Sequence, residues 1–277
     1  MRAIKYFEKK KKFNKIAKDI QTIKIQGAKN VAKKALEAYL LFPSKKSKKK
    51  LISLRPTEPM LVKVLNEVEK TSKKEVLEHF SFSQEKINKE VFKLIKDKDI
   101  IFTHCHSSSV TASLIYSKNK KKKFEVYNTE TRPLFQGRKT SRELSKAKIK
   151  VTQFVDSAMK IALTKTQGTK KVKKIFLGAD AILEKGVINK VGSGMLSEIA
   201  EENKIPLYII TDSWKYSKKS IEMEERNFKE IWEKLSKNYK IKIRNPAFEF
   251  VPKENIKGII SEFGTLSYDK FLEKMKK

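Results

Sequence analysis

The stretch "DIIFTHCHSSSVTASLIYSKNK", residues 99–120, decides the fold. It opens with a short β-branched and aromatic run, residues 99–104, which predicts a strand that is apolar on both faces. A stretch at helical spacing follows from Ser109, and polar side chains lie between the two. A buried strand that leads directly into a helix is the repeating unit of a parallel α/β sheet.

The same unit recurs through the rest of the chain. Five more runs predict strands, at residues 123–128, 150–155, 174–178, 206–211 and 258–262, and helical stretches fit between them. We therefore expect a Rossmann-like, doubly wound, mainly parallel sheet. In such sheets ligands bind beyond the carboxyl ends of the strands.

The part of the chain before this sheet is predicted to be helical. Apolar residues recur at helical spacing in "VAKKALEAYLLF", "MLVKVLNEVEK" and "KINKEVFKLIK", and Pro43, Pro56 and Pro59 are expected to break the helices. We expect an N-terminal helical domain over residues 1–97 and an α/β domain over residues 98–277 that carries most of the site.

The chain is strongly basic. It carries 64 Lys and Arg against 32 acidic residues, a net charge of +32, and 57 of the 64 are lysine. Such a charge raises the question of a nucleic-acid partner. The lysines are spread over the whole chain, however, and no block joins arginines with aromatic residues. We expect a generally basic surface that attracts phosphorylated small molecules, and no dedicated nucleic-acid binding.

The compartment follows from what the sequence lacks. One cysteine excludes an intramolecular disulfide, and there is neither an apolar run of about 18 residues nor a signal-peptide core. We therefore expect a soluble cytoplasmic protein without a membrane partner.

Polar side chains follow five of the predicted strands. They lie at residues 103–107, 128–132, 156–157, 178–180 and 211–213. Any one of them could cap the following helix, but the five together favour a site. Residues 186–195, "GVINKVGSGM", add Asn189 and Lys190 before a Gly-Ser-Gly turn whose helix start favours a phosphate.

Motifs for cofactors are missing from the sequence. Neither the P-loop pattern nor a G-x-G-x-x-G after a strand occurs. If residues 104–106 continue the strand, His104 and His106 point to one side and Cys105 to the other, so they cannot share a metal ion. His79 has no partner at ligand spacing. We expect no metal and no cofactor.

Four segments carry a family resemblance. They are "THCHSSS", "TETRPLFQG", "GADAI" followed by "GVINKVGSG", and "NPAFEFVPKENIKGIISEFG". They resemble the family that unites ribose 1,5-bisphosphate isomerase, methylthioribose 1-phosphate isomerase and the alpha, beta and delta regulatory subunits of initiation factor 2B. The match runs in order from about Ile25 to Gly264.

The resemblance favours an enzyme of one branch. The regulatory subunits typically lack the cysteine and aspartate that this chain keeps as Cys105 and Asp180. "THCHS" with the short "ETRPLFQG" is more similar to ribose 1,5-bisphosphate isomerase, which acts in nucleoside monophosphate salvage. Methylthioribose 1-phosphate isomerase and a regulatory subunit that binds a phosphorylated ligand and a translation factor remain the alternatives.

The resemblance also implies roles for individual residues. Cys105 moves a carbon-bound proton and Asp180 shuttles protons at oxygen, for which we expect the pKa of the thiol to lie below its usual value of about 8.5. Two phosphate cradles are implied, one from the helical half and one from the α/β half: Gln26, Gly27, Ala28 and Arg55, then Ser107, Ser108, Ser109, Asn189, Lys190 and Lys215. Arg132 and Gln136 are expected to brace the site or an interface rather than touch the substrate. A homodimer or hexamer is implied as well.

One departure from the family concerns Gln26. The isomerases normally carry Arg-Gly-Ala where this chain has Gln26-Gly27-Ala28. Losing a charge-assisted contact to phosphate costs about 1.5–3 kcal/mol of binding. The departure bears on substrate identity more than on proton transfer.

Overall fold

The computed structural model describes residues 2–236 and 238–276. Within these ranges the chain begins with α1 (Arg2–Gln21), α2 (Ala28–Leu41), α3 (Lys45–Ser53), α4 (Pro59–Glu67) and α5 (Lys73–Leu94). Strands and helices then alternate: β1 (Ile100–Thr103), α6 (Ser108–Asn119), β2 (Glu125–Thr129), α7 (Gln136–Lys146), β3 (Lys150–Phe154), η1 (Asp156–Ala158), α8 (Met159–Leu163), β4 (Lys174–Leu177), β5 (Ala181–Ile182), β6 (Gly186–Lys190), α9 (Ser193–Glu202), β7 (Leu207–Ile210), η2 (Ser213–Lys215), η3 (Phe228–Glu230), β8 (Phe248–Pro252), η4 (Lys253–Asn255), β9 (Gly258–Ser261), β10 (Gly264–Leu266) and α10 (Tyr268–Lys276).

The main sheet has the strand order β10-β9-β7-β4-β1-β2-β3. Within the described part of this sheet, β10 runs antiparallel to β9, and the other neighbouring strands are parallel. The chain winds from β1 through β2 and β3 toward one edge, and from β4 through β7 and β9 toward the other. The switch point therefore lies between β1 and β4, where such sheets bind their ligands.

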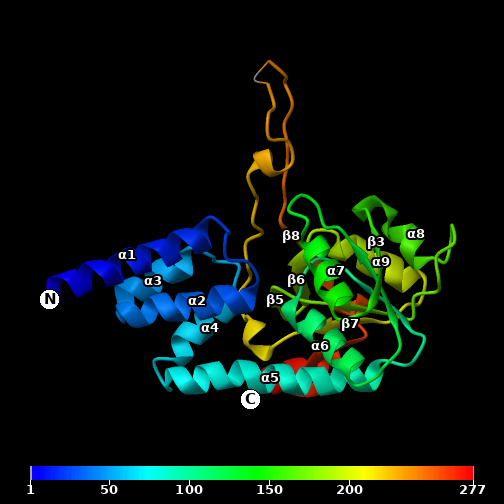
Figure 1. Cartoon of the computed structure of the whole chain (residues 1–277), viewed down its shortest axis with the longest axis horizontal. Helices are drawn as coiled ribbons and strands as arrows, with labels where there is room; N and C mark the ends of the chain where they lie inside the picture. Colours follow the sequence, from blue (N-terminus) through cyan, green and yellow to red (C-terminus); the bar gives the residue numbers. More distant parts are fainter. Residues whose placement is uncertain (1, 237, 277) are drawn as a thin grey trace.

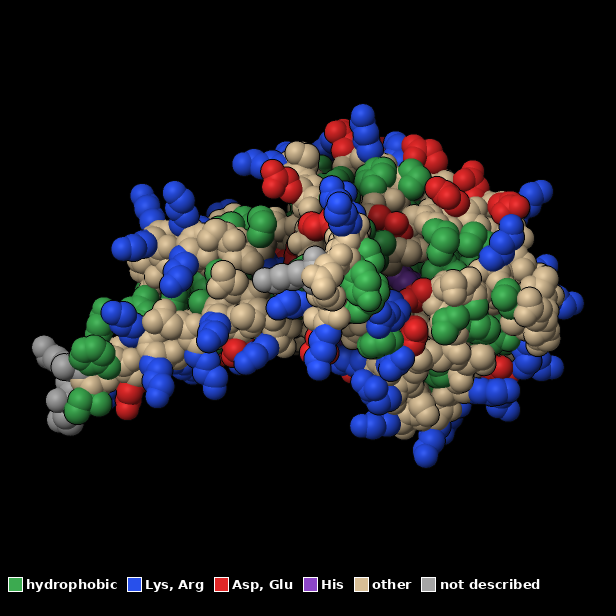
Figure 2. Space-filling model, turned by 90° about the horizontal axis from the view of Figure 1, so that it is seen from above, with side chains coloured by type: hydrophobic (Ala, Val, Ile, Leu, Met, Phe, Trp, Pro, Cys, Tyr) green, Lys and Arg blue, Asp and Glu red, His purple; other side chains and the backbone are tan. Residues whose placement is uncertain are grey.

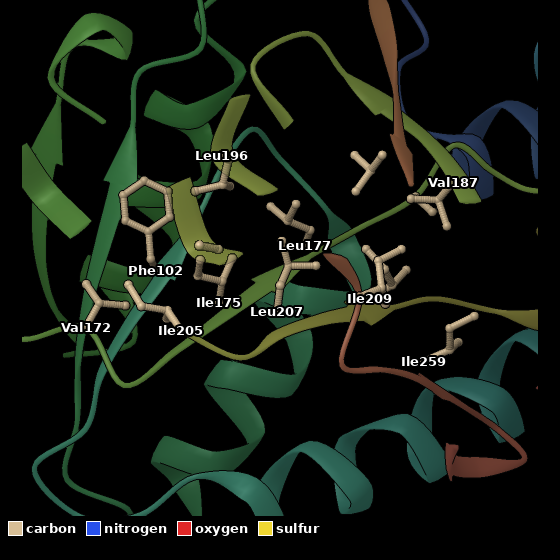
Figure 3. Close-up of a cluster of buried hydrophobic side chains, with 14 of the residues drawn as sticks. Phe102, Val172, Ile175, Leu177, Val187, Leu196, Ile205, Leu207, Ile209 and Ile259 are labelled. Carbon is tan, nitrogen blue, oxygen red and sulfur yellow. The ribbon is translucent and has the colours of Figure 1, made fainter. Parts of the chain in front are cut away.

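Helices cover both faces of this sheet (Figure 1). Ile101 packs with Val91 of α5 and Val110 of α6 on one face. Its neighbour Phe102 belongs to the cluster on the opposite face, with Leu196 of α9 (Figure 3). Successive strand residues thus lie in separate cores, so the strands are apolar on both sides. The predicted fold class, a doubly wound and mainly parallel sheet, is confirmed.

All six predicted strands are present, and four further strands were not predicted. β5, β6 and β8 form a separate three-stranded antiparallel sheet, and β10 is the antiparallel edge of the main sheet. β5 is only two residues long, and β10 covers three. Runs this short carry no usable period of hydrophobicity.

The helices α1 to α4 lie beside the α/β body, and α5 runs along both (Figure 1). Phe80 of α5 belongs to a core with helices α2 and α4, whereas Ile87 and Val91 belong to a core of the sheet. A capping box of Ser72 and Glu75 starts α5. The domain boundary at residue 97 stays a prediction, because α5 contributes to both cores.

An extended arm, residues 217–236 and 238–247, projects between these two parts (Figure 1). Its two sides meet at an antiparallel bridge between Glu225 and Pro246. The arm leads into β8 and carries Glu224 and Arg226, whose side chains reach the helical part and the site described below.

Basic side chains are spread over the whole of the face that Figure 2 shows. This distribution agrees with the spread of lysines along the sequence. In the described part of the chain, no helix combines the length and apolar character that a membrane span requires.

A buried ion pair joins the end of α5 to the sheet. The Lys174 ammonium lies 2.5 Å from Oδ2 of Asp99 and donates to the carbonyl of Leu94 at 2.6 Å. Both charged side chains are about nine-tenths buried, at 11% and 8% exposure. The pair therefore compensates two charges that would otherwise be costly to bury.

We predict that Lys174→Met lowers the free energy of unfolding by about 3–5 kcal/mol, because it leaves the Asp99 carboxylate buried and uncompensated. Urea denaturation measures this loss. The matched control is Lys173→Met, at an exposed neighbouring position, with an expected change within about 0.5 kcal/mol. Equal losses in the two variants would contradict the role of the pair.

Candidate active site

The carboxyl ends of β1 and β4 approach each other closely. The two strands pair in parallel, with Phe102 opposite Ile175. Beyond them, a Cβ atom at Gly178 would lie 2.7 Å from both Cβ and Oγ of Ser107. Position 178 therefore requires glycine, and its absence of a side chain brings the Cys105 segment beside Asp180.

Cys105 lies on a turn after the strand. β1 ends at Thr103, and Cys105 has a φ of 66°, in the left-handed region. The Cys105 N–H donates to Thr131 Oγ1 at 3.0 Å, and Thr140 Oγ1 donates to the Cys105 carbonyl at 2.9 Å. The backbone of the cysteine is thus fixed from two other elements. Residues 104–106 do not continue the strand, so the alternation of side chains considered in the sequence analysis does not apply to them.

The two neighbouring histidines have separate partners. His104 lies 2.5 Å from Thr129 Oγ1 and 2.8 Å from the Val191 carbonyl. His106 lies 3.0 Å from Thr140 Oγ1. Burial lowers the pKa of both imidazoles. The three residues do not gather around one point, because each histidine is held by its own threonine.

One cavity joins the two halves of the chain. Its lining includes all but one of the predicted site residues: Gln26, Gly27, Ala28, Arg55, Cys105, Ser107, Ser108, Asp180, Asn189, Lys190 and Lys215. Ser109 is the exception. It is buried, and its carbonyl accepts hydrogen bonds from Ser113 Oγ and Gln84 Nε2. Ser109 thus contributes to the packing of α6 against α5.

Other lining residues escaped the sequence analysis. They are Ile23, Lys29, Glu58, His106, Gln136, Lys139, Gly178, Ala179, Arg226 and Phe248. Gln136 was expected to brace the site, yet it lines the cavity, and its Oε1 is buried without a partner among the described residues. A sequence signal was present for His106, Gly178 and Ala179, which lie within two of the polar strand ends that the sequence analysis marked.

The cavity is rich in cations that come from distant segments. Lys29 lies at the start of α2, Lys139 on α7 and Arg226 on the arm. Burial, with a smaller contribution from the Lys33 charge, lowers the pKa of Lys29 to about 8. Lys215 donates to the Ala179 carbonyl at 2.5 Å, so its ammonium is held next to Asp180. This set of charges suits a ligand with more than one negative group.

The Cys105 thiol is more basic than the sequence analysis expected. Burial raises its pKa to about 11, and the Lys190 charge, which acts in the opposite direction, does not offset it. Asp180 and Asp156 raise the pKa further. The expectation of a lowered pKa is therefore wrong for the protein alone, because it counted the helix start and basic groups but not burial.

Arg55 is already engaged by a carboxylate. Its Nη2 lies 3.1 Å from Glu58 Oε1, and both side chains are buried. Burial raises the pKa of Glu58 to about 8, and Asp180 adds to the rise. The predicted phosphate ligand and an unpredicted acid thus share one wall of the cavity.

A second cluster lies outside the cavity lining. His79 Nε2 is 3.0 Å from Asp212 Oδ1, its ring stacks on Trp214 at 3.6 Å, and Glu262 lies close enough to complete a metal-ligand set. His79 therefore has partners from far along the chain, contrary to the sequence analysis. The Asp212 carboxylate also accepts from the Trp214 N–H, and Glu262 accepts from Ser213. These bonds connect α5 to the ends of β7 and β9.

The fold and cavity together define an α/β protein with a cation-lined pocket at the switch point of its sheet. The chain matches the model of the Initiation factor 2 subunit family over residues 45–268, and it belongs to this family. The expected resemblance is confirmed.

Curated relatives extend over nearly the whole chain. Ribose 1,5-bisphosphate isomerase of Methanocaldococcus jannaschii is 33% identical over 89% of this chain and 89% of its own length. The protein of the same name from Archaeoglobus fulgidus is 30% identical over 90% of this chain and 88% of its own length. These relatives confirm the expectation that the chain is an isomerase.

A solved structure shares the fold. The translation initiation factor eIF-2B of Pyrococcus horikoshii OT3 superposes with a TM-score of 0.81 at 25% identity, covering 92% of this chain and 96% of that one. Proteins named as isomerases and as translation factors thus share this architecture. The fold alone therefore does not decide between the two functions, which have to be argued from the residues of the site.

The raised pKa of Cys105 has a direct chemical consequence. We predict that iodoacetamide alkylates the native protein at pH 8 about 100-fold more slowly than free cysteine, because only the thiolate reacts. The rate should keep rising with pH toward about 11. Intact mass measures the reaction cleanly, since the chain has one cysteine.

Urea-unfolded protein is the control for this measurement and should react like free cysteine. A native rate that levels off at pH 8 or below would show an ordinary or activated thiol, contrary to the structure.

Proposed function

We propose that this protein converts ribose 1,5-bisphosphate to ribulose 1,5-bisphosphate. The observation that carries the proposal is the shared cavity, in which Cys105 and Asp180 lie with cations from both halves of the chain. Curated relatives with this name support the choice of substrate. The reaction is an aldose-ketose isomerisation and needs no cofactor.

Asp180 would act at the oxygens. Its carboxyl gives a proton to the ring oxygen, and the bond between that oxygen and C1 breaks. In the last step the same carboxylate takes the proton of the C2 hydroxyl, which becomes the ketone. The aspartate therefore ends the reaction in the state in which it began.

Cys105 would act at the carbons. Its thiolate takes the proton from C2 after the ring has opened, which gives an enol between C1 and C2, and the thiol then returns a proton to C1. Lys190 favours the thiolate, since its charge lowers the thiol pKa against the larger effect of burial. Substrate and product are isomers, so no proton is gained or lost overall.

Two groups of residues would hold the phosphates. The start of α6, with Ser107 and Ser108, lines the cavity together with Asn189 and Lys190, and free backbone N–H groups at a helix start favour an anion. The helical half offers Gly27 and the start of α2 with Lys29. The ammonium of Lys29 compensates for the neutral Gln26.

We also propose a metabolic role, a compartment and an oligomeric state. The activity would serve nucleoside monophosphate salvage in the cytoplasm, and the protein would act as a homodimer or hexamer, as the resemblance implies.

We predict that purified protein isomerises ribose 1,5-bisphosphate, and that Cys105→Ser or Asp180→Asn lowers kcat by about 10²–10⁴-fold. NMR follows the appearance of the ketone, and methylthioribose 1-phosphate is assayed beside it. Both variants should retain the circular dichroism of the parent. Tight binding of the bisphosphate without turnover by the parent protein would contradict the proposal.

Two observations favour the alternative function, a regulatory subunit without catalytic activity. The Pyrococcus horikoshii structure with the same fold is a translation initiation factor, and Gln26 removes a charge from the phosphate site. A stable complex with a translation factor in pull-downs, together with absent turnover, would favour this alternative.

A further inference from the structure

The best phosphate ligand in the cavity is occupied by the protein itself. Arg55 Nη2 lies 3.1 Å from Glu58 Oε1 and 3.7 Å from Oε2 of Glu224 on the arm. Arg55 and Glu58 are only 7% and 1% exposed, and both line the cavity that holds Cys105. An incoming phosphate therefore meets a guanidinium that already has a carboxylate partner.

The pair is incompletely satisfied. Arg55 Nε and Glu58 Oε2 are buried, and neither has a hydrogen-bond partner among the described residues. Leaving such atoms unpaired costs about 1–3 kcal/mol each. A ligand oxygen would satisfy Arg55 Nε, and a proton would let Glu58 Oε2 donate instead of standing as an unpaired acceptor.

Charges of both signs face Glu58. Asp180 and Glu224 disfavour its ionised form, whereas Arg55 and Lys215 favour it. Burial is the largest influence and, with Asp180, sets the pKa at about 8. The carboxyl therefore changes protonation state within reach of physiological pH.

Anion binding and protonation of Glu58 must be linked. A doubly charged anion on Arg55 repels the Glu58 carboxylate across a buried site, so it favours the neutral acid. Linkage requires the reverse too, since protonating Glu58 must strengthen anion binding by the same factor.

We propose that Glu58 is a proton-dependent specificity residue, which holds Arg55 in the free protein and releases it to a phosphate group by taking up a proton from solution at Oε2. The assignment of a phosphate ester as ligand rests on the proposed function. Arg55 would then bind a phosphate only when Glu58 takes up a proton. At alkaline pH, where Glu58 stays ionised, phosphate binding at Arg55 would be weakened.

The test uses sulfate, a divalent anion that does not titrate between pH 6 and 9. Calorimetry in two buffers of different ionisation enthalpy gives the protons taken up per sulfate bound. At pH 8.5 about three-quarters of Glu58 is ionised in the free protein, so we expect it to contribute about 0.7 proton. In Glu58→Gln the proton uptake per sulfate should be smaller by this amount.

The affinity should change with pH in the same sense. Between pH 7 and 9 the Kd of the parent protein for sulfate should rise about tenfold more than the Kd of Glu58→Gln, because the variant has no carboxylate to protonate. Glu58 precedes α4 without making a side-chain cap hydrogen bond, so the variant loses no cap. Thermal melting checks its fold.

Two matched variants separate the neighbouring charges. Lys29→Met removes the other cavity group with a pKa of about 8, and it should keep the proton uptake that Glu58 contributes. Glu224→Gln removes the second carboxylate near Arg55 and should tighten sulfate binding while leaving that uptake in place.

Each outcome decides the matter. Equal proton uptake by the parent and Glu58→Gln, or no uptake by Lys29→Met, would overturn the role of Glu58. Linked uptake in a protein that fails to isomerise ribose 1,5-bisphosphate would remove the proposed function but keep this inference. Turnover of ribose 1,5-bisphosphate by a protein whose sulfate binding takes up no proton at Glu58 would keep the proposed function and overturn this inference.

Discussion

The ends of β1 and β4 meet at a separation that only glycine at position 178 permits, since any Cβ there would overlap Ser107. Everything at the site depends on this contact. It places the turn that carries Cys105 beside the loop that carries Asp180, at the point where the winding of the sheet reverses. Thr131 and Thr140 then hold the backbone of the cysteine in a left-handed conformation. The thiol and the carboxyl share a cavity because two strands, 75 positions apart in sequence, are neighbours in the sheet.

Burial dominates the chemistry of this cavity. It makes the Cys105 thiol and the Glu58 carboxyl more basic and the Lys29 ammonium more acidic. In each case the neutral form gains, since an ion loses hydration that fixed partners replace only in part. Such a site is poised to respond to an incoming anion. A bisphosphate would add negative charge beside Lys29 and favour its ammonium, while the same charge favours the neutral form of Glu58. Proton balance in this site is therefore part of ligand recognition.

The sequence predicted the parts of the structure that repeat a strong local pattern. Six strands and the helices between them follow from apolar runs, although the edge strand β3 is largely exposed, and Asp180 follows from its place after one of these strands. The residues Gln26, Gly27, Ala28 and Arg55 of the helical half came only from family resemblance. Glu58, Lys29 and Arg226 were missed because they reach the cavity from the turn before α4, from α2 and from the arm, and no local pattern reports a contact between segments that are far apart in sequence. The pKa of Cys105 was predicted in the wrong direction, because neighbouring charges can be read from a motif whereas burial cannot.

The central claim is that Cys105 carries a proton between two carbons of a phosphorylated sugar. Running the isomerisation of ribose 1,5-bisphosphate in D₂O tests it directly. The thiol exchanges its proton with solvent, so NMR should find deuterium at C1 of the ribulose 1,5-bisphosphate that forms. The label should enter only through the thiol, so Cys105→Ser should lose both turnover and C1 deuteration. Deuterium that Cys105→Ser incorporates at C1 at the rate of the parent protein would show a different base, and would contradict the role assigned to the cysteine.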